Sequence, residues 1–285
     1  MTNSFRFRAA SREQTIAALL RIGDLPYAPS TIEALDRERR RPALDAEAVT
    51  AATSSDPALL AKILWAANRP DRGAPREAAT ASHAAALLGA DELERIASAI
   101  SLAAPFLPVE ERLVDVVRFR RSSVLTALLS RRIAEDLGRR RSGEAYAAGL
   151  LADVGALLVA GVFPEAGVEA LESGDAPERA ERDRLGATSA EIAAFLLNLW
   201  NLPSSLVETT LLRDRPGDAT TDPELTAIVH MATVVARSVG ETGYALERDL
   251  DLDASIVDTL RLGGERYLHD LTRSYRDLAL GADAA

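Results

Sequence analysis

The sequence contains no cysteine and only three histidines in 285 residues. Without cysteine, the chain cannot form disulfides, thiolate metal sites or a cysteine nucleophile. The histidines, His83, His230 and His269, lie on separate predicted helices and lack the close spacing of a metal-binding pair. Each is therefore interpreted as a surface or packed side chain rather than a ligand. Spacing alone does not exclude a Ser-His-Asp arrangement, but positions inside predicted helices disfavour it.

Other signatures of catalysis and export are also missing. No G-x-S-x-G elbow occurs, and Gly149 and Gly155 lie inside a predicted helix rather than a phosphate-binding loop. The N-terminus lacks the apolar core of a signal peptide, which predicts a cytoplasmic protein. Only residues 145–163 approach the length of a membrane span. That stretch is rich in alanine and glycine and contains Asp153, so it is predicted to be a buried core helix.

The charge balance is acidic, with a net charge of −10 and a pI near 5.0. Such a surface disfavours nucleic acid and anionic membranes as partners. The basic run from Arg37 to Arg41 is interpreted as the solvated C-terminal turn of a helix, because no aromatic residue is interleaved for stacking on bases. A hydrophobic content of 47% predicts a folded chain with a sizeable core.

Helical periodicity occurs almost throughout, and strand-type alternation does not, which predicts an all-α fold of about a dozen helices. Helix starts are predicted where capping residues precede apolar faces: Ser30, Asp56 before Pro57, Thr188 with Glu191, and Asp222 before Pro223. Leu20 is placed on the inner face of the first helix, and Ile192, Phe195, Leu196 and Leu199 on that of a later one. Residues 165–184 are predicted to form a charged connection. Trp65 and Trp200 are predicted to be packing residues.

Pro105 and Pro108 interrupt the helical pattern, which predicts a boundary near residues 105–112. The predicted organisation has two helical lobes: residues 21–110 and residues 111–240. A helical extension flanks each end, over residues 1–20 and 241–285. Because the lobes occupy nearly the whole chain, no fused output domain is expected.

Seven motifs occur in an order that resembles the HDOD domain, a divergent branch of the HD-type metal-dependent phosphohydrolases. They are Leu25-Pro26 with Pro29, DPALLAKILWAAN from Asp56, Leu87-Leu88-Gly89, FRRSSVLTALLSRRIAE from Phe119, AGLLADVGALLV from Ala148, LGATSAEIAAFLLNLWNLP from Leu185, and ELTAIVHMATVVA from Glu224. The resemblance covers residues 20 to 240. It implies a two-lobed helical bundle whose C-terminal lobe has an HD-type core.

The same resemblance implies that the metal site has been lost. Histidines are expected where this chain has Ser122, Ala152, Ser189, and the Leu212-Arg213 pair, so only Asp153 remains of the signature. Serine, alanine and leucine cannot replace imidazole as ligands of a hydrolytic metal. We therefore expect no metal, no cofactor and no catalytic residue in this chain.

Asp153 requires a partner, because a carboxylate among apolar side chains is costly unless it is paired. Arg120, Arg121 and Arg213 are expected to line the degenerate site, and one of them is the predicted partner. A second hypothesis keeps an open, arginine-lined cleft that binds an anionic nucleotide or a cyclic dinucleotide. A third is a residual metal-dependent phosphohydrolase.

The resemblance predicts a stand-alone signalling or regulatory protein of bacterial type that contacts other signalling proteins. A homodimer is an alternative assembly. No nucleic-acid or membrane partner is expected.

Overall fold

The computed structural model describes residues 11–41, 45–73, 77–103 and 109–239, and isolated positions between 252 and 275. Within these residues the protein has thirteen α-helices and no strand, so the predicted all-α fold is confirmed. The predicted helices near 256–262 and 267–278 lie largely outside the described residues, as do Pro105 and Pro108 at the predicted boundary.

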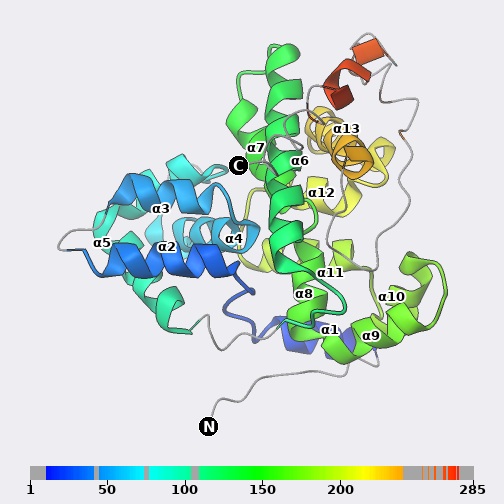
Figure 1. Cartoon of the computed structure of the whole chain (residues 1–285), viewed down its shortest axis with the longest axis horizontal. Helices are drawn as coiled ribbons and strands as arrows, with labels where there is room; N and C mark the ends of the chain where they lie inside the picture. Colours follow the sequence, from blue (N-terminus) through cyan, green and yellow to red (C-terminus); the bar gives the residue numbers. More distant parts are fainter. Residues whose placement is uncertain are drawn as a thin grey trace.

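Four helices form the N-terminal lobe: α2 (Pro29–Arg39), α3 (Ala46–Thr53), α4 (Pro57–Ala67) and α5 (Ala81–Ala103). A short 3-10 turn, η1 (Pro70–Arg72), follows α4. The Leu87-Leu88-Gly89 motif lies at a kink in α5. Gly89 has a φ of 73° there, a left-handed conformation that favours glycine. Figure 1 shows this lobe beside the longer C-terminal one.

The C-terminal lobe is built around α6 (Val116–Asp136) and α7 (Ser142–Leu151), which run side by side. The remaining elements pack around this pair: α8 (Val154–Val162), α9 (Pro164–Glu172), α10 (Pro177–Leu185), α11 (Ser189–Leu199), α12 (Ser204–Leu212), η3 (Pro216–Asp218) and α13 (Pro223–Val239). Gly149 allows the close approach of α7 to α6, since a Cβ there would lie 2.8 Å from the Thr126 carbonyl oxygen.

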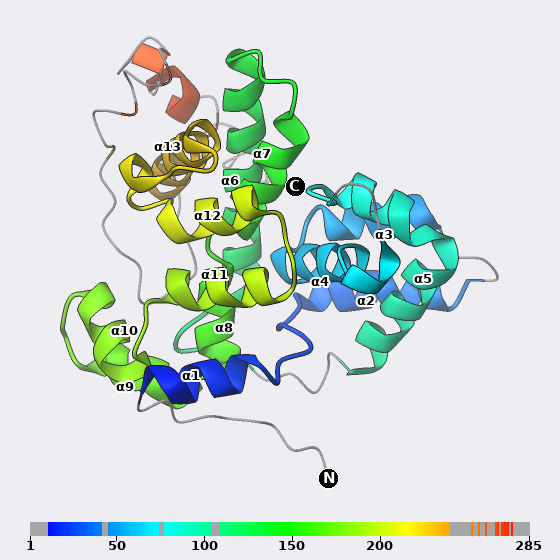
Figure 2. The same cartoon turned by 180° about the vertical axis from the view of Figure 1, so that it is seen from behind.

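The first helix, α1 (Arg12–Leu19), packs on the C-terminal lobe although it precedes the other lobe in sequence. Figure 2 shows it next to α9 and below α8 and α11. Thr15 Oγ1 donates a hydrogen bond to the carbonyl oxygen of Leu185, 2.6 Å away. The chain therefore passes from the C-terminal lobe into the N-terminal lobe and back again.

The two lobes meet at α4 and at the turn that precedes it. Trp65 on α4 stacks on Trp200 at the end of α11, with ring centroids 5.3 Å apart, which confirms both as packing residues. Arg120 Nε donates to the carbonyl oxygen of Ser55 at 2.8 Å. The Tyr146 hydroxyl donates to the carbonyl oxygen of Ser54 at 2.6 Å. Consecutive residues of one turn thus bind two helices of the opposite lobe.

Several sequence predictions about local structure hold. Asp56 caps α4 ahead of Pro57, Thr188 and Glu191 form a capping box on α11, and Asp222 accepts a hydrogen bond from the Leu225 amide. The stretch from Ser142 to Val162 is apolar enough to cross a membrane, but 83% of its apolar 18-residue window is buried inside the protein, as expected for core helices.

Other local predictions are wrong. Ser30 is not a cap, because α2 already begins at Pro29, whose ring suits the first helical position. The predicted single helix over residues 145–163 is interrupted: Asp153 leaves the helical region, with φ −108° and ψ 15°, and separates α7 from α8. The predicted connection over residues 165–184 forms α9 and α10, each started by a proline and, in α10, supported by ion pairs at i,i+4 spacing.

Three apolar residues predicted to face inward are exposed. Phe195 and Leu199 are 36% and 39% exposed, because the inner stripe of α11 runs through Ile192, Leu196 and Leu197 and leaves these two at its edge. Leu20 lies just past the end of α1 and is also exposed.

The buried cap Asp56 leads to a stability prediction. Its carboxylate accepts hydrogen bonds from the amides of Ala58 and Leu59 in α4, and from the Ala28 amide in front of α2. We expect Asp56→Ala to lower the free energy of unfolding by about 2 kcal/mol, since three buried donors lose their acceptor. Asp45 caps α3 similarly but is half-exposed, so Asp45→Ala should lower the free energy of unfolding by less than about 1 kcal/mol. Urea denaturation of both variants measures the two losses. Equal losses in both variants would contradict this assignment.

Candidate functional site

Asp153 lies at the joint between α7 and α8, in the middle of the C-terminal lobe. Its neighbours Ala152 and Val154 are fully buried, whereas its own side chain keeps 21% of its surface exposed. The interruption of the helix places Asp153 ahead of α8, but its side chain does not cap that helix. The carboxylate instead meets side chains from α12 and α13.

Arg213, which follows the last residue of α12, is the main partner of Asp153. Its Nη2 lies 2.8 Å from Asp153 Oδ1, and only 7% of its side chain is exposed. The same guanidinium donates from Nη1 to the Thr210 carbonyl oxygen at 3.0 Å, and its Nε lies 3.7 Å from Asp214 Oδ1. The backbone carbonyl of Arg213 is in turn hydrogen-bonded to Nδ1 of His230 at 2.7 Å. Arg213 is therefore fixed at both ends.

Arg237, near the end of α13, is a second partner that the sequence analysis missed. Its Nη2 lies 3.3 Å from the same oxygen, Asp153 Oδ1, and its side chain is 13% exposed. A signal was present in the sequence: Thr226, His230, Thr233 and Arg237 form a polar stripe at helical spacing along α13. Its first three members are fully buried. Buried polar side chains aligned in this way indicate partners inside the protein.

The two arginines decide the ionisation of the site. Burial raises the pKa of Asp153, but the positive charges of Arg213 and Arg237 outweigh that effect and hold the pKa below its ordinary value. Burial likewise lowers the pKa of Arg213, and the carboxylates of Asp214, Asp153 and Glu181 more than compensate, so its pKa is raised. Asp153 and Arg213 are therefore both charged at neutral pH.

The other predicted site residues occupy the surrounding helices. Ser122 is half-buried on α6, Ala152 is buried at the α7–α8 joint, and Leu212 is half-buried at the end of α12. Ser189 is buried at the start of α11, where its amide donates to Glu181 Oε2 at 2.9 Å. A Cβ on Gly155 would lie 2.1 Å from the Ser189 carbonyl oxygen, so α8 and α11 are in direct backbone contact here.

Only one of the three arginines predicted as candidate partners of Asp153 is seen to pair with it. Arg213 makes the ion pair described above. Arg120 reaches into the other lobe, where it donates to the backbone and side-chain oxygens of Ser55. Arg121 is exposed on α6.

The residues around Asp153 do not fit a catalytic metal. Its Oδ1 is already bound by two guanidinium groups, whose charge opposes a divalent cation. In the part of the chain that the structure describes, no group of three or more histidine, cysteine, aspartate or glutamate side chains could hold a metal ion. The histidines are dispersed: His83 is on α5, His230 binds the Arg213 carbonyl, and His269 is an exposed residue 3.8 Å from Asp270.

Comparison with known proteins identifies the fold of this two-lobed structure. The family model of the HDOD domain matches residues 25–216. The chain belongs to the HDOD domain family. A search of curated proteins found no match for this HDOD protein.

Solved structures with the same fold include three bacterial proteins. The MmoQ response regulator from Methylococcus capsulatus str. Bath is 25% identical, with a TM-score of 0.72 over 88% of this chain and 99% of its own. A virulence factor from Campylobacter jejuni subsp. jejuni is 20% identical, with a TM-score of 0.65 over 79% and 81% of the two chains. An HDOD domain protein of unknown function from Geobacter sulfurreducens is 20% identical, with a TM-score of 0.51 over 95% and 96%.

Proposed function

We propose that this HDOD protein is a non-catalytic regulatory protein that acts through contacts with other proteins. The observation that carries the proposal is the pairing of Asp153 with Arg213 and Arg237, at distances of 2.8 and 3.3 Å. The carboxylate that the family resemblance assigns to the metal is here neutralised by guanidinium groups. This arrangement supports a structural role for the remnant of the HD signature.

The chemistry of the neighbouring positions supports the same conclusion. A hydrolytic metal ion needs several imidazole or carboxylate ligands to lower the pKa of a bound water. Ser122, Ala152, Ser189 and Leu212 offer two hydroxyl groups and two aliphatic side chains instead. None of these replaces an imidazole as a ligand.

Membership of the HDOD family and similarity to the MmoQ response regulator support the regulatory part of the proposal. The net charge of −10 favours protein partners over nucleic acid or anionic membranes. We propose that these partners are cytoplasmic. Another copy of the chain is one such partner. A nucleotide sensor in the degenerate cleft is less well supported, because Asp153, Asp214 and Glu181 already balance the charge of Arg213.

The absence of catalysis can be tested directly. The purified protein, supplemented with manganese and then with other divalent cations, should hydrolyse p-nitrophenyl phosphate and bis-p-nitrophenyl phosphate no faster than buffer containing the same metal. Elemental analysis after gel filtration should find no bound metal in stoichiometric amount. Both results are expected because the ligand set around Asp153 is missing.

Asp153→Asn is the matched control, because it keeps the shape of the side chain but removes its charge. A trace of contaminating phosphatase would be equally active in wild-type and Asp153→Asn preparations. Metal-dependent turnover in the wild type that disappears in Asp153→Asn would contradict the proposal. It would revive the hypothesis of a residual phosphohydrolase.

A further inference from the structure

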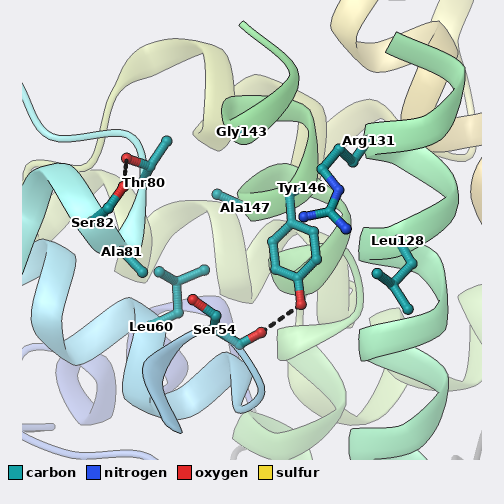
Figure 3. Close-up of a pocket in the computed structure, with 10 residues that line it drawn as sticks. All are labelled: Ser54, Leu60, Thr80, Ala81, Ser82, Leu128, Arg131, Gly143, Tyr146 and Ala147. Carbon is teal, nitrogen blue, oxygen red and sulfur yellow. Dashed lines mark hydrogen bonds between the residues drawn. The ribbon is translucent and has the colours of Figure 1, made fainter. Parts of the chain in front are cut away.

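A cavity of about 270 Å³ lies between the two lobes, away from Asp153. One wall comes from the N-terminal lobe, with Ser54 after α3, Leu60 on α4 and residues 80–82 at the start of α5. The opposite wall comes from α6 and α7, including Arg131 and Tyr146. Figure 3 shows the Tyr146 ring between these walls, with its hydroxyl pointing to Ser54 and the Arg131 guanidinium beside it.

The polar lining of this cavity is cationic and hydroxyl-bearing. Arg131 is the charged residue among the lining side chains, and its guanidinium lies 5.2 Å from the centre of the Tyr146 ring. Hydroxyl groups come from Ser54, Thr80, Ser82 and Tyr146, and no carboxylate belongs to the described lining. The remaining surface is aliphatic. Such a lining favours a ligand with an anionic group attached to an apolar body.

The surroundings strengthen the positive potential. Burial raises the pKa of Tyr146, and the charges of both Arg131 and Arg120 act in the opposite direction, so two guanidinium groups lie within electrostatic range of this ring. The cavity also receives the first turns of α5 and α7, whose dipoles are positive at that end. Glu144 binds Arg141 and Ser205. Glu135 is an exposed residue outside the lining, and its long ion pair with Arg131, at 4.0 Å, offsets only part of the arginine charge.

We propose that this interlobe cavity is a binding site for a small organic anion of the phosphate monoester class. Arg131 contacts the phosphate, and Leu60, Leu128 and Ala147 contact the apolar body. The hydroxyl groups of Ser54 and Tyr146 already donate to the carbonyl oxygens of Thr50 and Ser54. The volume lies just below the usual range of ligand pockets, about 300–1,000 Å³, so it accommodates a monoester but not a cyclic dinucleotide. Because the walls belong to different lobes, a bound ligand stabilises the present arrangement of the lobes.

This site is separate from the Asp153 network and does not depend on whether the protein is catalytic. If the cavity does not bind phosphates, the proposed regulatory function is unaffected. If the protein proves to be catalytic, the cavity proposal is unaffected. The two proposals are therefore tested independently.

Isothermal titration calorimetry tests the site with three probes: inorganic phosphate, phenyl phosphate and phenol. We expect saturable binding of both phosphates, with phenyl phosphate the tighter because its ring reaches the aliphatic surface, and no saturable binding of uncharged phenol. Arg131→Gln should weaken phenyl phosphate binding about tenfold, the loss expected for a partly exposed charged hydrogen bond. Binding of phenol as tight as that of phenyl phosphate, or no saturable binding of either phosphate, would overturn the proposal.

Two further variants separate a defined site from general surface charge. Arg132→Gln removes the neighbouring charge, which pairs with Asp136 outside the cavity, and should leave the affinity unchanged. Ser82→Glu places a negative charge at the exposed cavity rim and should also weaken binding about tenfold, whereas its position in the first turn of α5 favours folding. Equal loss of affinity in Arg131→Gln and Arg132→Gln would show that the phosphates bind the surface non-specifically, and the site would be rejected.

Discussion

Asp153→Ala is expected to lower the free energy of unfolding by about 3 kcal/mol, the low end of the cost of breaking a buried ion pair. Arg213 and Arg237 would remain almost buried without the carboxylate that now binds both of them. The one-fifth exposure of Asp153 lets water replace part of the lost interaction, which is why the low end applies. Urea denaturation followed by circular dichroism measures the effect.

Asp183→Ala provides a matched control for this substitution, because Asp183 also pairs with an arginine but is exposed on α10. It should change the free energy of unfolding by less than about 1 kcal/mol. An Asp153→Ala variant as stable as the wild type would show that the arginines are satisfied by other groups.

The pH dependence gives a second readout of the same pair. The folded-state pKa of Asp153 is lowered, so its stabilising contribution is complete above the unfolded-state value of about 3.9 and is lost as pH falls through the folded-state value. The difference in stability between the wild type and Asp153→Asn should therefore be largest near neutral pH and shrink in acid. A difference independent of pH would rule out an ionised Asp153.

Gly155→Ala is expected to destabilise the protein by about 3 kcal/mol, the upper part of the range for overpacked cores. The added Cβ would lie 2.1 Å from the carbonyl oxygen and 2.6 Å from the carbonyl carbon of Ser189. These are backbone atoms, so no rotamer change relieves the clash, and α8 must move away from α11. A thermal or urea unfolding curve measures the loss.

Gly143→Ala is the control for this substitution, because Gly143 is also a helical glycine near the start of its helix. Its Cβ would lie 3.4 Å from Thr80 Cγ2, the end of a side chain, and the change should be close to neutral. A neutral Gly155→Ala would contradict the close approach of the two helices.

Sequence reasoning succeeded where a local rule is sufficient. Asp56 before Pro57, and Thr188 with Glu191, mark helix starts because a cap depends on residues only two or three positions away. The helix α3 could have been found by the same rule, since Asp45 caps it by accepting from the Glu47 and Ala48 amides. The all-α class followed from periodicity alone.

Sequence reasoning failed where a helix end, the burial of a side chain or an ion-pair partner depends on residues far away in the sequence. The apolar stretch around Asp153 carries no proline, so nothing local indicated that α7 ends at Leu151. Phe195 and Leu199 fit an inward-facing pattern as well as Leu196 does, and only the packing partners of α11 determine which of them is covered. Arg237 lies 84 positions from Asp153, so its role depends on the tertiary fold.

The stacking of Trp65 on Trp200 gives the protein a built-in optical probe. The sequence contains two tryptophans in total, one on each side of the contact between the lobes. Their coupled indole transitions and their emission depend on how the rings face each other, so the ultraviolet spectrum of the unlabelled protein reports directly on whether the halves are together or apart.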